Sequence, residues 1–166
     1  MEKAQYWIDG LSLNKHPEGG WYKEIYRSNE VIALSHLPSR FSGNRSFATS
    51  IYFLLEGTDF STLHRIKADE IWHFYEGSSL EIVSIDSDGN LEKVILGRNL
   101  LAGEKLQHVV PHGCWFGARV LDPNSYSLVG CGVAPGFDFE DFEMGDRSIL
   151  RAKYPLLTGL IDAYTR

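Results

Sequence analysis

The sequence has few cysteines and prolines, and it has no long apolar run. Its 166 residues include six prolines and two cysteines, Cys114 and Cys131. Two cysteines without an export signal indicate free buried thiols and not a disulfide framework. No apolar run approaches the length that crosses a membrane, so no membrane partner is expected. The N-terminus, MEKAQYWIDGL, lacks the apolar core of a signal peptide, which predicts a cytoplasmic protein.

Positive charge is also scarce. Sixteen Lys and Arg stand against twenty-two Asp and Glu, for a net charge of −6, and the basic residues form no cluster. A nucleic-acid surface needs local positive charge, so no nucleic acid is expected as a partner. Aromatic residues, by contrast, make up 13% of the chain, and there are sixteen glycines. This composition suits a β-protein whose sheets pack on each other or around a ligand.

Short apolar stretches separated by turn residues run through the middle of the chain. A strand is expected at 21–28 and a strongly apolar one at 47–55, with a polar loop at 37–45 between them. Because no helical stretch interrupts the later strands, the pattern predicts an all-β sandwich or barrel of jelly-roll type, in one domain over residues 1–166. The later strands are expected at about 60–66, 70–76, 79–86, 91–96, 105–110, 114–121 and 126–133.

Helices are expected only near the two ends of the chain. Residues 2–10 have the spacing of a short amphipathic helix. Asp146 can cap a helix that follows it, and Pro155 can begin another. Between the last strand and these helices, residues 134–146 alternate phenylalanine with acidic residues. We expect those aromatic rings to pack on the outside of the barrel while the acids remain in water.

Two glycine-framed motifs carry a family resemblance. The stretch Gly57–Gly77 contains His64 and Glu70, and the stretch that begins at Gly103 ends in Pro-His-Gly at 111–113. Both resemble the motifs of the cupin superfamily. Three longer phrases, HPEGGWYKEIYRS, DEIWHFYEG and VGCGVAPGFDFEDFEM, resemble one branch of it, the uncharacterised RmlC-like cupins of Cupin_5 type. The resemblance implies a cupin double-stranded β-helix with short terminal helices, a barrel cavity open at one end and a homodimer.

The resemblance also implies where a metal would bind. Metal-binding cupins use two histidines, a glutamate and a third histidine, and those positions hold His64, Ile66, Glu70 and Phe116 here. One imidazole and one carboxylate are too few donors for a transition-metal site, so we expect no metal and no other cofactor. The alternative is a metal-dependent enzyme that uses His64, Glu70 and His73. Strand alternation opposes it, because His73 and Glu70 should point to opposite faces unless a bulge intervenes.

Without a metal, the chain is similar to the RmlC-type sugar epimerases, in which a barrel histidine abstracts a proton next to a carbonyl. That histidine falls near His64, and a lysine of those enzymes falls near Glu70, which reverses the charge and puts their substrate in doubt. The resemblance implies a metal-independent isomerase or epimerase acting on a sugar-like or small polar substrate, with His64 as base and Glu70 orienting it. The other interpretation is a protein that binds a small-molecule ligand without chemistry.

Ligand contacts are expected from side chains around this pair. Tyr52 and Gln107 contribute only if their strands point them inward. Glu24 lies on an N-terminal strand of the kind that cupin dimers often exchange, so it could reach a cavity from a partner chain. His16, in its glycine-rich turn, is expected to be a loop residue. The expected ligand-binding residues are Glu24, Tyr52, Trp72, Phe74, Gln107 and Phe116.

Overall fold

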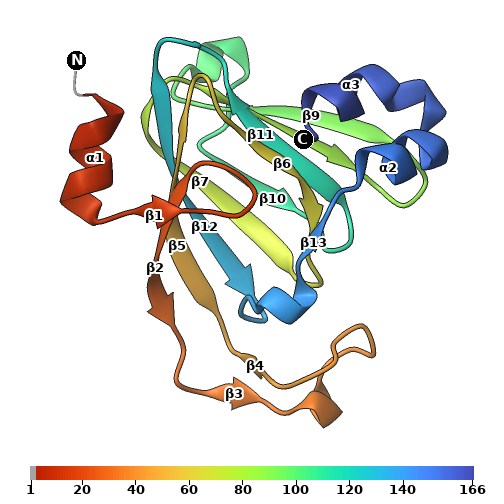
Figure 1. The fold of residues 1–166 in the computed structure, drawn as a ribbon. Helices are drawn as coiled ribbons and strands as arrows, with labels where there is room; N and C mark the ends of the chain where they lie inside the picture. Colours follow the sequence, from red (N-terminus) through yellow and green to blue (C-terminus); the bar gives the residue numbers. More distant parts are fainter. Residues whose placement is uncertain (1–2) are drawn as a thin grey trace.

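Two antiparallel β-sheets face one another in the computed structural model, which describes residues 3–166 (Figure 1). The larger sheet has the order β1-β2-β5-β12-β7-β10 and the smaller one β13-β6-β11-β8-β9. The larger sheet is built from β1 (Asn14–Lys15), β2 (Trp21–Arg27), β5 (Thr49–Glu56), β12 (Tyr126–Ala134), β7 (Asp69–Gly77) and β10 (Gln107–Val110). The smaller sheet is built from β13 (Glu143–Met144), β6 (Phe60–Arg65), β11 (Trp115–Val120), β8 (Leu80–Ile85) and β9 (Leu91–Leu96). The predicted all-β jelly roll is confirmed.

One apolar core fills the space between the two sheets. It takes Phe53 from β5, Trp72 from β7, Ile82 from β8 and Phe116 from β11, all almost fully buried. Each strand supplies alternate residues to this core because successive side chains of a strand point to opposite faces. In β7 the buried positions are Glu70, Trp72 and Phe74. The same alternation therefore brings a carboxylate into the barrel.

The α-helices lie near the two ends of the chain, as predicted, and pack outside the sheets. Helix α1 (Ala4–Leu11) packs Ile8 on the outer face of the larger sheet, and α2 (Arg147–Lys153) and α3 (Thr158–Ala163) pack on the smaller one. Asp146 caps α2, its Oδ1 accepting a hydrogen bond from the Ile149 amide at 2.9 Å. No helix within residues 3–166 is long and apolar enough to cross a membrane. Short 3₁₀ turns occur at η1 (Leu34–His36), η2 (Leu100–Ala102), η3 (Phe139–Asp141) and η4 (Pro155–Leu157).

A two-stranded ribbon projects from the end of the larger sheet (Figure 1). Its strands, β3 (Val31–Ile32) and β4 (Arg45–Ser46), pair through Val31 with Ser46 and Ile32 with Arg45. The predicted polar loop over 37–45 lies between them. The ribbon and the strand that leads into it carry exposed large apolar side chains at Ile25, Tyr26, Val31, Leu34 and Phe47.

Candidate functional site

A cavity of about 130 Å³ lies within the barrel, against the inner face of the larger sheet. Strands β2, β5, β6, β7 and β12 line it, together with the loop before β2 and the segment after β12. Its walls are mostly aromatic and aliphatic. The titratable side chains that line it include His16, Glu18, His64 and Glu70.

His64 of β6 is held through both ring nitrogens. Its Nδ1 lies 2.7 Å from the carbonyl oxygen of Thr62, and its Nε2 lies 3.1 Å from Oε2 of Glu18. A carbonyl oxygen only accepts hydrogen bonds, so Nδ1 carries a proton. Burial lowers the pKa of His64 and raises the pKa of Glu18. Both shifts favour the neutral forms, and in those forms the carboxyl of Glu18 donates to Nε2 of His64.

Glu18 reaches this position from a tight glycine turn. Gly19 and Gly20 have φ values of 114° and 72°, in the left-handed region that side chains with a Cβ rarely adopt. A Cβ at Gly19 would also lie 2.2 Å from the carbonyl oxygen of Phe60. The turn packs the preceding carboxyl into the barrel, where Oε1 of Glu18 accepts a hydrogen bond from Ser61 Oγ at 2.8 Å.

Glu70 of β7 lies in the same cavity without an ion-pair partner within residues 3–166. Burial raises the pKa of Glu70 to about 7, against the opposing charge of His64. The thiol of Cys131, on the neighbouring β12, lines the same cavity and opposes part of this rise in the pKa of Glu70. The structure thus corrects the expected pairing, since Glu18 and not Glu70 contacts His64. The sequence could not show this because the contacting carboxylate comes from a distant loop.

His16 is a cavity residue that the sequence analysis treated as part of a simple turn. Its Nδ1 accepts a hydrogen bond from the amide of Glu18 at 3.4 Å and lies 3.4 Å from Oε2 of the same residue. Its ring meets Tyr22 edge-on, with centroids 4.5 Å apart. Burial lowers the pKa of His16. The signal in the sequence was the HPEGG phrase itself, which places an imidazole and a carboxylate two residues apart before two glycines.

Three expected ligand residues lie at or beside the cavity. Trp72 and Glu24 line it. Phe116 does not line the cavity itself but packs against His64, which does, with ring centroids 4.1 Å apart. A register shift in β2 after Glu24 brings Arg27 to the cavity as well, where it binds the Glu24 carboxylate through Nε at 3.0 Å and Nη2 at 2.7 Å.

The other three expected ligand residues lie elsewhere. Tyr52 points to the outer face of the larger sheet, because its neighbours Ile51 and Phe53 are the ones that line the cavity. Gln107 is exposed, opposite His73 on the same outer surface. Phe74 is buried in the core but does not line the cavity. These positions correct the expected contacts of Tyr52, Gln107 and Phe74.

Residues 136–143, called here the cover segment, close one side of the cavity. The alternation of phenylalanine with acids predicts these rings on the outside of the barrel, and the structure corrects that prediction. Phe137, Phe139 and Phe142 line the cavity, and Phe139 is also 55% exposed. Phe142 stacks on His64, with ring centroids 5.2 Å apart and an interplanar angle of 29°. The rings that the sequence alternates with acids therefore form a wall of the site.

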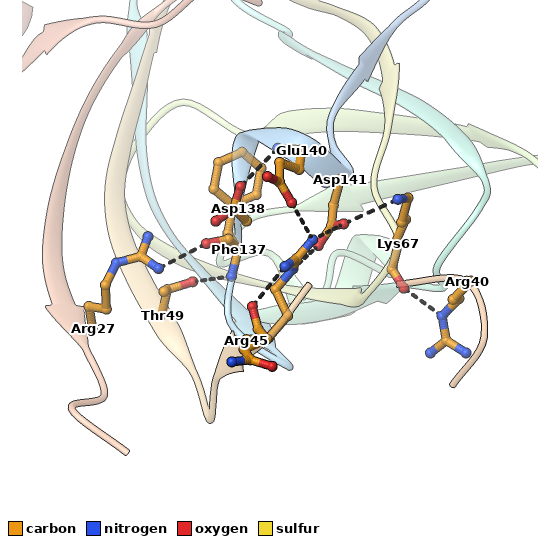
Figure 2. A network of polar contacts seen from close by, with 10 residues as sticks. Arg27, Arg40, Arg45, Thr49, Lys67, Phe137, Asp138, Glu140 and Asp141 are labelled. Atoms are coloured by element: carbon orange, nitrogen blue, oxygen red, sulfur yellow. Dashed lines mark hydrogen bonds and ion pairs between the residues drawn. The ribbon is translucent and has the colours of Figure 1, made fainter. Parts of the chain in front are cut away.

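Polar contacts hold the cover segment in place (Figure 2). Arg45 of the ribbon donates to Asp141 through Nε at 2.6 Å and Nη2 at 2.7 Å, and both side chains are buried. The Phe137 amide donates to Thr49 Oγ1 at 2.9 Å, and its carbonyl accepts from Arg27 Nη1 at 3.0 Å. Asp141 is buried in spite of its acidic surroundings because a guanidinium binds both its oxygens.

Two antiparallel sheets closed around a ligand-sized cavity define a cupin-type jelly roll, and comparison with known proteins agrees. A family model described as "Cupin superfamily (DUF985)" matches residues 5–145, most of the chain. The chain belongs to this family, which confirms the resemblance stated from its motifs.

Relatives of similar size occur in distant organisms. Protein SO0799 from Shewanella oneidensis has a crystal structure that matches with a TM-score of 0.89 and 42% identity, covering 100% of this chain and 99% of that one. A hypothetical protein from Leishmania major matches with a TM-score of 0.89 and 33% identity, covering 99% of each chain. The yeast "Uncharacterized protein YML079W" (Saccharomyces cerevisiae) is 33% identical over 147 residues, which span 82% of this chain and 72% of the yeast protein.

A more distant likeness shows the fold alone. Oxalate decarboxylase from Bacillus subtilis matches with a TM-score of 0.55 and 14% identity, over 91% of this chain and 36% of that one.

The metal-ligand positions that the cupin resemblance implies hold Ile66 and Phe116 beside His64 and Glu70, and His73 does not line the cavity. No group of three or more His, Cys, Asp or Glu within residues 3–166 is arranged to hold a metal ion. The donor set does not fit the metal of that resemblance.

Proposed function

We propose that this cupin is a metal-independent isomerase or epimerase that moves a proton next to the carbonyl group of a small polar or sugar-like molecule. The observation that carries the proposal is Glu70, a buried carboxyl whose pKa is raised to about 7 inside a ligand-sized cavity. A group with that pKa both accepts and returns protons near neutral pH. Strongly perturbed carboxyls in clefts are typical of functional sites.

In the proposed reaction, the Glu70 carboxylate takes the proton from the carbon beside the carbonyl. The electron pair of the broken C–H bond forms a C=C bond, and the carbonyl oxygen becomes an enolate oxygen. If that carbon carries a hydroxyl group, its O–H proton moves to the enolate oxygen, and return of the abstracted proton to the former carbonyl carbon leaves a new C=O at the hydroxyl position, which is an isomer. Delivery of a proton from water to the opposite face of the original carbon gives an epimer. Assigning Glu70 as the base departs from the sequence-based expectation for His64, because both nitrogens of His64 already have partners.

The cavity limits the size of the substrate. Apolar cavities of about 150 Å³ in other proteins bind benzene, so about 130 Å³ suits a molecule of about six non-hydrogen atoms, the size of a three-carbon hydroxycarbonyl compound. The aromatic walls supply flat faces for the C–H surface of a small sugar, as Trp72 and Phe142 illustrate. Larger conjugates would have to extend through the cavity mouth beside Glu24 and Arg27.

Hydrogen exchange with solvent tests the proposal directly. The protein is incubated in D₂O with a panel of hydroxyaldehydes and hydroxyketones of roughly three to six carbons, and loss of the α-proton signal is followed by NMR. At least one compound should exchange, and Glu70→Gln should slow that exchange by about 10²- to 10⁴-fold. Glu76→Gln on the same strand is the matched control, because Glu76 contacts Arg98 outside the cavity. Equal exchange rates in wild type and Glu70→Gln would refute the role of Glu70.

A protein that binds a ligand without chemistry is the second candidate, and the enclosed aromatic cavity supports it equally well. A thermal-shift screen with the same panel separates the two, since any ligand of the native state raises the melting temperature. Stabilisation of the wild type without α-proton exchange would favour binding alone.

We also propose a homodimer in the cytoplasm. Five exposed apolar side chains on β2 and the ribbon support a contact with a second copy, and the two free thiols support a reducing compartment. Light scattering at micromolar concentration should give twice the monomer mass. A monomer would contradict the dimer, and charged replacements at Val31 and Phe47 should dissociate it.

A further inference from the structure

One imidazole nitrogen in the cavity has no partner. Both ring nitrogens of His64 have polar partners. In His16 the nitrogen Nδ1 has a partner, but Nε2 makes no hydrogen bond within residues 3–166. The ring lines the cavity and is fixed edge-on against Tyr22. Phe142 also meets it edge-on, with centroids 6.3 Å apart. The open nitrogen is thus held in one place by aromatic packing.

The backbone contact of His16 assigns its tautomer. The amide of Glu18 can only donate, so Nδ1 accepts from it and the neutral ring carries its proton on Nε2; Oε2 of Glu18, also 3.4 Å from Nδ1, would favour the opposite tautomer if it accepted from the ring. The titratable groups beside the ring are Glu18 of its own turn and His64 of β6. Burial, the largest cause, keeps the pKa of His16 below its usual value; Glu18 opposes this shift and His64 adds to it. At neutral pH, His16 therefore offers an N–H group to the cavity while remaining uncharged.

We propose that His16 is a second catalytic residue, whose Nε2–H hydrogen-bonds the carbonyl oxygen of the substrate and stabilises the enolate oxygen that forms when Glu70 takes the proton. This inference rests on the proposed function. It makes His16 an electrophilic donor and not a base, because the nitrogen that is left without a partner, Nε2, is the one that carries the proton.

The apolar lining of the cavity explains why such a donor is needed. The enolate oxygen would form among mostly aromatic and aliphatic walls, where a negative oxygen without a hydrogen-bond donor is unfavourable. A fixed N–H donor aimed at the developing charge typically contributes about 10²- to 10³-fold to the rate. The substrate class follows: a neutral carbonyl compound whose oxygen accepts a hydrogen bond at His16.

Two substitutions distinguish a hydrogen-bond donor from a base. His16→Phe removes the donor, and we expect α-proton exchange to fall by about 10²- to 10³-fold. His16→Gln keeps a side-chain N–H near the position of Nε2 but cannot take up a proton, and we expect it to retain at least a tenth of the wild-type rate. The exposed His36, changed to Phe and to Gln, is the matched control. Wild-type exchange in His16→Phe, or equal loss in both His16 variants, would overturn the inference.

A second readout does not depend on turnover. In protein labelled with ¹⁵N-histidine, long-range ¹H–¹⁵N NMR at pH 7 should report His16 as the neutral Nε2–H tautomer. Glycolohydroxamate, a small enediolate analogue, should shift that Nε2–H signal downfield in the wild type and in Glu70→Gln. An Nδ1–H or cationic ring, or an Nε2–H signal unmoved at saturating glycolohydroxamate, overturns the role of His16. Absence of α-proton exchange in the wild type overturns the proposed function, whatever the tautomer.

Discussion

Nε2 of His64 lies 3.1 Å from Oε2 of Glu18, and the other ring nitrogen lies 2.7 Å from the carbonyl oxygen of Thr62. The histidine at the centre of the barrel is therefore fixed in place and in tautomer. The same carboxyl of Glu18 accepts a hydrogen bond from the hydroxyl group of Ser61 and lies beside His16. One residue of a glycine turn thus organises three side chains, while Glu70 remains free to titrate.

Because Glu18 favours its neutral form, we expect two substitutions at this position to differ in their effect on stability. Glu18→Gln should leave the free energy of unfolding nearly unchanged, because the amide NH₂ can donate to His64 Nε2 and its oxygen can accept from Ser61. Glu18→Ala should cost about 2 to 4 kcal/mol, since it leaves both buried partners without a hydrogen bond. Urea denaturation at pH 7 measures the two. If Glu18→Gln cost as much as Glu18→Ala, Glu18 would have to be ionised beside a charged imidazole.

Glu70 predicts a stability that depends on pH. The pKa of its carboxyl is about 7 in the folded protein and near its ordinary value of 4.5 when unfolded, so between these values the folded state binds the extra proton. The free energy of unfolding should therefore fall as pH rises from 4.5 to 7 and then level off. Glu70→Gln stays neutral throughout. Its advantage over the wild type should grow from near zero at pH 4.5 to on the order of 3 kcal/mol at pH 8.

Denaturation curves at half-unit steps of pH test this difference. Comparing the two proteins removes the contributions of Glu18, His16 and His64, which both share. Glu76→Gln serves as the control on the same strand, and its difference from the wild type should not grow over this range. A constant difference between Glu70→Gln and the wild type would mean that Glu70 titrates normally.

Strand alternation made the barrel predictable from sequence, but it did not decide every face. It placed Glu70 and Trp72 inside and His73 outside, as the structure has them. It left Tyr52 and Gln107 open, because period-two alternation shows which residues share a face but not which face turns inward. The neighbours of Tyr52 decide that question only in three dimensions.

The contacts that complete the site could not be predicted from local sequence patterns, because they join residues far apart in the chain. Glu18 and Ser61 are 43 residues apart, and Arg45 and Asp141 are 96 apart. Such contacts depend on how a loop crosses the sheet, which no periodicity encodes. The phenylalanines of the cover segment were assigned to the wrong surface for this reason: their alternation with acids is the same whether the rings face the cavity or the outside.

Arg45 and Asp141 predict how firmly the cover segment is held. Arg45→Met should lower the free energy of unfolding by about 3 kcal/mol, because it removes the guanidinium that binds both oxygens of the buried Asp141 and leaves Lys67, 3.4 Å away, as the one cation on that carboxylate within residues 3–166. Arg65→Met is the matched control. Its partner Glu143 is exposed, so the loss should stay below about 1 kcal/mol.

Hydrogen exchange should locate the effect of Arg45→Met. Protection should fall first in the amides of 136–143, including that of Phe137, which donates to Thr49. Restoring an uncharged pair in Arg45→Met with Asp141→Leu should recover part of the lost stability, since no buried charge is then left alone. Equal losses in Arg45→Met and Arg65→Met would show that the buried pair contributes no more than a surface one.

Phe142 shields His64 from water, and its removal predicts a change in titration. Burial is the main cause that lowers the pKa of His64, and Phe142 stacks directly on that ring. Phe142→Ala should admit water and raise the pKa of His64 toward its ordinary value of 6.5, so that the imidazolium appears at higher pH than in the wild type. NMR titration of the histidine ring protons measures the shift. Phe47→Ala, at an exposed ring outside the cavity, should leave the pKa of His64 unchanged, and the same result for Phe142→Ala would show that the cover segment does not set the environment of His64.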